Sequence, residues 1–71
     1  MNRFLRYSLQ NGRKIRVMLM LDGAIVQKNA VVLALEDTSA VLQLSQKKAP
    51  VTVALHDILS CDYARGDHGE E

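Results

Sequence analysis

The sequence contains few of the residues that mark several specialised classes of protein. Its 71 residues include one cysteine, one proline, three aromatic side chains and no tryptophan. Because a single cysteine cannot form an internal disulfide, the small secreted proteins that depend on disulfides are excluded. No apolar run reaches the ~18–20 residues that a membrane-spanning helix needs, and residues 1–7 lack the apolar stretch of a secretory signal. We therefore expect a cytoplasmic protein.

Neither sign of charge is in excess, since nine Lys and Arg residues stand against eight Asp and Glu residues. The positions of the charges are more informative than their sum. The charged residues of 1–21 are all basic, and those of 57–71 are mostly acidic. One interpretation is a phosphate-binding patch around Arg13, Lys14 and Arg16, with the acidic end of the chain tuning it or competing for it. The other is an ordinary solubilising surface without a partner.

Aliphatic side chains, by contrast, are abundant. Hydrophobic residues make up 48% of the chain and are concentrated in residues 15–59. A chain of this length buries only about 60% of its unfolded surface, so its core is thin. The apolar content exceeds what one small core usually needs. Either both faces of a sheet are covered, or another copy of the chain covers one of them.

The hydrophobic periodicity predicts a short helix followed by five strands. Gly12 ends the helix, and Asp22-Gly23 predicts a two-residue type I′ hairpin between the first two strands. The second strand is longer than usual, so we expect it to bend or bulge near Lys28-Asn29, where Asn tolerates a positive φ. The predicted elements are a helix at about 3–10, strands at about 14–21, 24–36, 40–45, 51–55 and 58–63, and a polar acidic tail at 64–71. This order predicts one mainly β domain over residues 1–63, a small, strongly bent, five-stranded antiparallel barrel.

The residues that could support catalysis or metal binding are sparse. Cys61 and His56 have an odd spacing that points their side chains to opposite faces of a strand, so Cys61 is expected to be a small core residue. A metal site of His56, Asp57, Asp62 and His68 would require ordering the polar tail. The glycines are isolated, and no phosphate-binding loop is present. We expect no enzyme, no metal and no cofactor.

Three segments carry a resemblance to a known family. They are Val17-x-Leu19-x-Leu21-Asp22-Gly23, then Val31-x-Leu33-x-Leu35-Glu36-Asp37, then Val41-x-x-Leu44. Together they are similar to the first Sm motif, and the layout of the chain resembles the Sm-like (Lsm) family, the bacterial Sm-like RNA chaperones of the Hfq type in particular. The segment Leu55-His56-Asp57-Ile58 resembles the Lys-His-Ala-Ile segment of those chaperones. The resemblance covers roughly residues 4–62.

The resemblance implies an Sm-like barrel that forms a homo-oligomeric ring, in which the fourth strand of one subunit pairs with the fifth of the next. The candidate interface residues are Val51, Val53, Leu55, Ile58, Leu59 and Cys61. An alternative is a monomeric barrel of the SH3-like type, in which the fifth strand pairs with the first strand of its own chain.

The resemblance also implies RNA as a partner. The candidate nucleic-acid contacts are Arg13, Lys14, Arg16, Lys28 and His56. Two positions depart from the family pattern, because Ser39 replaces a base-stacking aromatic residue and Leu55 replaces a lysine. The second hypothesis is therefore a protein-interaction or regulatory module of the same fold that binds no nucleic acid.

Overall fold

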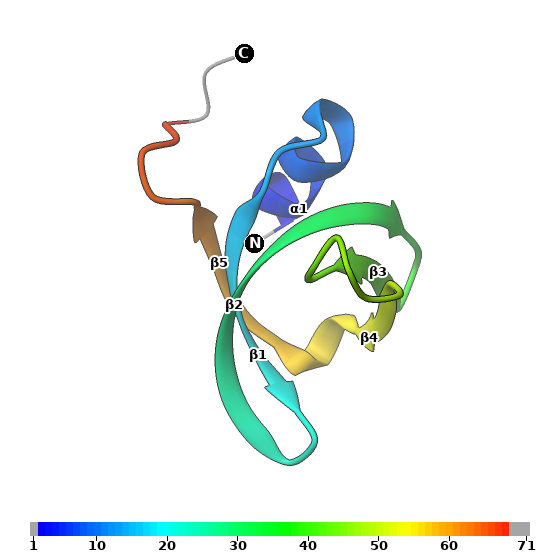
Figure 1. Cartoon of the computed structure of the whole chain (residues 1–71). Helices are drawn as coiled ribbons and strands as arrows, with labels where there is room; N and C mark the ends of the chain where they lie inside the picture. Colours follow the sequence, from blue (N-terminus) through cyan, green and yellow to red (C-terminus); the bar gives the residue numbers. More distant parts are fainter. Residues whose placement is uncertain (1, 69–71) are drawn as a thin grey trace.

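The computed structural model describes residues 2–68 as one helix packed on a five-stranded antiparallel sheet (Figure 1). The elements are α1 (Asn2–Asn11), β1 (Ile15–Leu21), β2 (Ala24–Leu35), β3 (Ser39–Gln43), β4 (Val51–Ala54), a 3₁₀ turn η1 (Leu55–Asp57) and β5 (Ile58–Tyr63). The strand order is β4-β3-β2-β1-β5. The prediction of a mainly β fold with an N-terminal helix and five antiparallel strands is confirmed.

The sheet is not closed into a barrel. β5 pairs with β1, from Ile15 opposite Tyr63 to Leu19 opposite Ile58. β4 pairs with β3, and within residues 2–68 no ladder joins β4 to β5. The closed barrel predicted from the sequence is therefore not confirmed, and the sheet ends in two free edges.

β2 is the strand that bends, because it pairs with two different neighbours along its length. Residues Ala24–Ala30 pair with β1, and the strand pairs with β3 from Val31 onward. Figure 1 shows β2 sweeping across the whole molecule. The register shifts between Val32 and Ala34, so the irregularity does not lie near Lys28-Asn29, where the β1 ladder runs unbroken. Asn29 does not use its tolerance of a positive φ, because the unbroken ladder with β1 keeps that residue extended.

The hairpin between β1 and β2 has the turn that the sequence predicted. Asp22 has a φ of 53° and Gly23 a φ of 80°. Two successive positive φ values define the type I′ turn, whose twist matches that of the flanking strands. Leu21 and Ala24 close the ladder on either side of it.

The core is formed by alternate residues of the strands and by one face of α1. Its fully buried side chains include Leu5 of α1 and Ile15, Val17 and Leu19 of β1. Ser8 is also buried: its hydroxyl donates to the carbonyl of Arg13 at 2.6 Å and accepts from the Val32 N–H at 2.8 Å. The first bond ties α1 to the segment that leads into β1, and the second ties it to the later half of β2. No helix within residues 2–68 is long and apolar enough to cross a membrane.

Candidate functional site

Two of the five candidate nucleic-acid contacts are paired with carboxylates of the same chain. The Arg13 Nε lies 3.6 Å from the Asp67 Oδ2, and an Arg16 guanidinium nitrogen lies 3.5 Å from the Asp62 Oδ2. The second pair follows from the sheet register, because Arg16 stands directly opposite Asp62 on the β1–β5 ladder. The acidic end of the chain thus lies against its basic beginning, which reduces the positive charge that this part of the surface offers to a phosphate.

The segment that follows β5 is docked on α1, at least as far as Asp67. The Tyr7 hydroxyl donates to both carboxylate oxygens of Asp67, at 2.8 and 3.0 Å. Partial burial of Tyr7 and this hydrogen bond raise its pKa above the usual value, since both favour the neutral phenol. Tyr63 packs edge-on against Phe4 and Tyr7, with ring centroids 4.9 and 5.2 Å apart. Of the tail predicted at 64–71, residues 69–71 lie outside the described residues.

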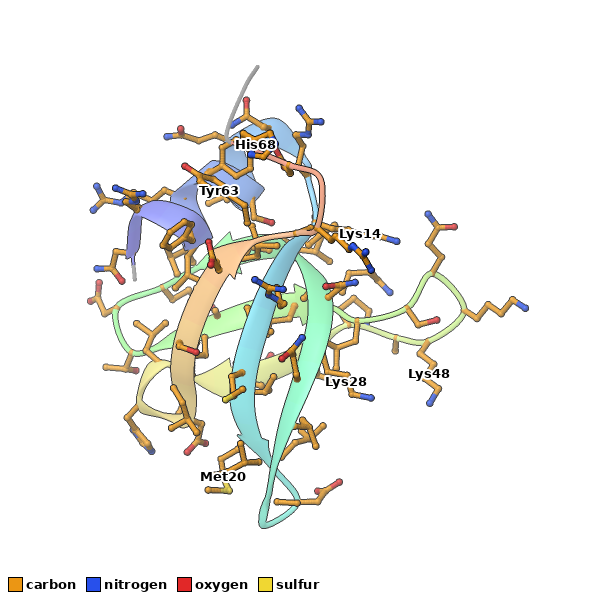
Figure 2. The ribbon with its side chains drawn as sticks, turned by 90° about the vertical axis from the view of Figure 1, so that its left-hand side faces the viewer. Lys14, Met20, Lys28, Lys48, Tyr63 and His68 are labelled. Atoms are coloured by element: carbon orange, nitrogen blue, oxygen red, sulfur yellow. The ribbon has the colours of Figure 1, made fainter. Side chains whose placement is uncertain are left out.

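The lysines form a separate basic surface. Lys14 and Lys28 have no carboxylate partner within residues 2–68, and the same holds for Lys47 and Lys48 in the loop between β3 and β4. Figure 2 shows Lys14, Lys28 and Lys48 projecting to the same side of the molecule. We call Lys14, Lys28 and Lys48 the lysine side. Sequence reasoning missed Lys47 and Lys48, although two adjacent lysines in a predicted loop were a usable signal.

The lysine side includes a shallow groove of about 190 Å³. Its apolar lining comes from β2 and from the end of β3, and Leu33 is 45% exposed there. The groove is lined by Lys14, Val31, Leu33, Gln43, Leu44, Ser45 and Gln46. An extended, flexible anion can contact the Lys14 ammonium group and the apolar lining at the same time. The groove therefore suits such an anion better than a compact one.

His56 does not join either basic group. It lies on η1, at the junction of the two edge strands, and its side chain is 85% exposed beside Asp57 at 3.6 Å. The five candidates therefore fall into three sets: two arginines with carboxylate partners, two lysines without, and one isolated histidine.

The free edges of the sheet offer mainly backbone groups to a partner. Of the candidate interface residues, Val53 and Ile58 are buried in the core of their own chain. Three more of the candidates are partly buried and pack against that core, namely Val51, Leu55 and Cys61. Leu59 alone among the six is well exposed, at 47%. The groups that remain available to a partner strand are therefore mainly the outward backbone N–H and C=O groups of β4 and β5.

The arrangement of Cys61 and His56 does not form a nucleophilic pair. Cys61 is half-buried against the core, and this burial raises the pKa of its thiol, whereas His56 faces solvent. No hydrogen bond links the two side chains in the described part of the chain, and no group of three His, Cys, Asp or Glu residues within 2–68 could hold a metal ion. Comparisons of the chain with protein-family models, with curated proteins and with solved structures gave no match.

Proposed function

We propose that this chain is a non-enzymatic binding module of Sm-like fold that assembles with copies of itself into a ring. In the assembly, β4 of one copy pairs with β5 of the next. The observation that carries the proposal is the sheet order β4-β3-β2-β1-β5, which leaves one side of each terminal strand unpaired within residues 2–68.

Edge strands are a liability when they are flat and uncharged, because their unpaired backbone groups recruit other strands. β4 has the sequence Val-Thr-Val-Ala, with no charge and no proline. β5 carries a single charged side chain, Asp62. When β4 of one copy pairs with β5 of the next, neither strand keeps an unpaired edge. If these head-to-tail contacts return to the first copy, the assembly is a closed ring.

The Sm-like part of the proposal is supported by the combination of elements. A short helix precedes a type I′ hairpin, and the long β2 strand serves two halves of the sheet, one with β1 and one with β3. Within residues 2–68 no ladder joins β4 to β5, so each of the two strands keeps one side available for a strand of another copy. The motif resemblance of residues 17–44 points in the same direction.

The mass of the protein in solution tests the assembly. We expect light scattering at micromolar concentration to give a multiple of 7.9 kDa. Leu59→Asp places a charge on the β5 edge and should lower the mass to that of one chain. Met18→Asp is the matched control, because Met18 is 37% exposed and lies on β1 where that strand pairs with β2 on one side and β5 on the other, and its mass should stay that of the assembly. A wild-type chain that stays monomeric throughout contradicts the proposal.

A second function, the binding of RNA or single-stranded nucleic acid, is favoured by the lysine side. Lysines without carboxylate partners attract phosphates and release counterions on binding. The half-buried Ser39 occupies the position where the resembled family stacks an aromatic on a base, so contacts to phosphates would supply most of the affinity.

Fluorescence anisotropy of a labelled oligouridine tests this second function. We expect binding at about 50 mM salt that weakens steeply towards 200 mM, with a log–log slope of about 0.7 for each phosphate contacted. Lys14→Glu combined with Lys28→Glu should abolish it. Arg3→Glu with Arg6→Glu makes the same change of charge on exposed positions of α1 and should lower the affinity much less. Absence of binding at low salt would leave the protein-interaction module as the function of the assembly.

A further inference from the structure

We infer that the two free edges of the sheet are complementary in charge, so that the β4 edge of one copy selects the β5 edge of another copy. The inference rests on the proposed self-association and names the residues that determine which edge of one copy pairs with which edge of the next. β4 itself is uncharged, but Lys47 and Lys48 precede it in the chain. The β5 edge has carboxylates instead, Asp57 at its start and Asp62 near its end.

The two lysines stand on a loop with a defined conformation. The side-chain amide of Gln43 donates to the carbonyl oxygens of Ser45 and Lys48, the latter at 2.7 Å. The Lys47 N–H donates to the Ser45 hydroxyl at 3.2 Å, and the Lys48 N–H donates to the Ser45 carbonyl at 3.3 Å. These bonds hold the backbone of both lysines at the entrance to β4, which lowers the entropy lost when a partner binds.

The carboxylates at the β5 edge are accessible. The Asp62 side chain is 61% exposed, and its ion pair with Arg16 leaves it open to solvent. The Asp57 side chain is 41% exposed beside His56. An exposed carboxylate can accept a second cation at little cost, because it is still partly hydrated.

The direction of the strands decides which charges meet. All four ladders of this sheet are antiparallel. If the contact between copies follows the same pattern, the start of β4 faces the end of β5, and Lys47 and Lys48 approach Asp62 of the next copy. Pairing of two β5 edges would instead bring Asp57 and Asp62 together, which is repulsive. Pairing of two β4 edges would not involve Asp62 at all.

Charge reversal tests the inference. Lys47→Glu with Lys48→Glu in one variant, and Asp62→Lys in a second, should each weaken the interface at least about tenfold, since attraction becomes repulsion at an exposed contact. Each variant should then have the mass of a single chain at a concentration where the wild type is assembled. An equimolar mixture of the two should assemble again, because the reversed charges of one attract those of the other. All three substitutions in one chain should also restore assembly.

Lys14→Glu with Lys28→Glu is the control of equal charge change, since both residues lie away from the edges, and it should leave the mass unchanged. A wild type that never assembles contradicts the proposed function itself. If the wild type assembles and Asp62→Lys assembles equally well, self-association stands and the charge-directed pairing is wrong. If both reversed variants dissociate but their mixture stays monomeric, the two edges do not face each other, and the inference is overturned.

Discussion

Ser8 is the polar side chain that the core of residues 2–68 depends on. Its hydroxyl bonds to both the Arg13 carbonyl and the Val32 N–H, and it is fully buried. Ser8→Ala removes the hydroxyl that both groups bond to and leaves the buried Val32 N–H without an acceptor, which costs about 1–3 kcal/mol. We expect a loss of that size in the free energy of unfolding from urea titration. Gln10→Ala, on the exposed side of the same helix, should change stability by less than about 0.5 kcal/mol.

Cys61 is a single residue that makes the folding stability depend on pH. Burial raises the pKa of its thiol above the ordinary 9.0, so the folded protein holds the proton more tightly than the unfolded chain does. The stability that this difference supplies is fully present below pH 9 and is lost as pH rises through the folded pKa. Thermal unfolding between pH 8 and 10 should show a smaller decline in Cys61→Ala than in the wild type. Equal declines in the two proteins would mean that the thiol is not the group responsible.

At the scale of single elements, the β1–β2 hairpin depends on the backbone of its turn. An added Cβ on Gly23 would meet no atom within 4 Å, so the only obstacle to a side chain is the φ of 80°. Gly23→Ala should therefore cost about 1–2 kcal/mol of stability through backbone strain alone. Asp22→Gly relaxes the neighbouring positive φ and serves as the control, with a change of about 0.5 kcal/mol or less in urea titration.

At the scale of the whole molecule, assembly and folding stability are linked. A partner that binds only the folded chain stabilises it by mass action. We expect the midpoint of thermal unfolding to rise with protein concentration, by the equivalent of about 1 kcal/mol per subunit for each tenfold increase. Leu59→Asp should unfold at a temperature independent of concentration. A wild-type midpoint that does not move over a hundredfold range would indicate an independent monomer.

The local sequence was sufficient to predict the elements and one turn. Asp22-Gly23 determined its hairpin, because the two-residue turn that fits twisted strands needs positive φ values and these residue types accept them. The alternation in residues 15–21 likewise matches the buried and exposed faces of β1. The bend of β2 was predicted near Lys28-Asn29, and the strand passes from β1 to β3 just after it, between Ala30 and Val31, whereas the register shift lies further along, between Val32 and Ala34.

The candidate site was predicted less well. Arg13 and Arg16 were grouped with Lys14 because they are close in the chain. The uneven distribution of charge suggested that the acidic end competes for this patch, but the sequence does not indicate which carboxylate meets which arginine. Lys48 joins the lysine side although it lies more than thirty positions from Lys14. Such groupings depend on contacts between distant residues, which a local pattern does not encode.

By itself, the sequence determined the periodicities, the turn residues and the excess of aliphatic side chains, because each of these acts over a few neighbouring residues or over composition. Only the tertiary structure decided that the sheet stays open, that two arginines meet carboxylates while the lysines do not, and that the interface candidates Val53 and Ile58 belong to the core of their own chain. The physical reason is that strand order and register bring together residues tens of positions apart. The single cysteine and the lack of a long apolar run excluded several classes of protein, but the free edges that suggest a function exist only in the folded chain.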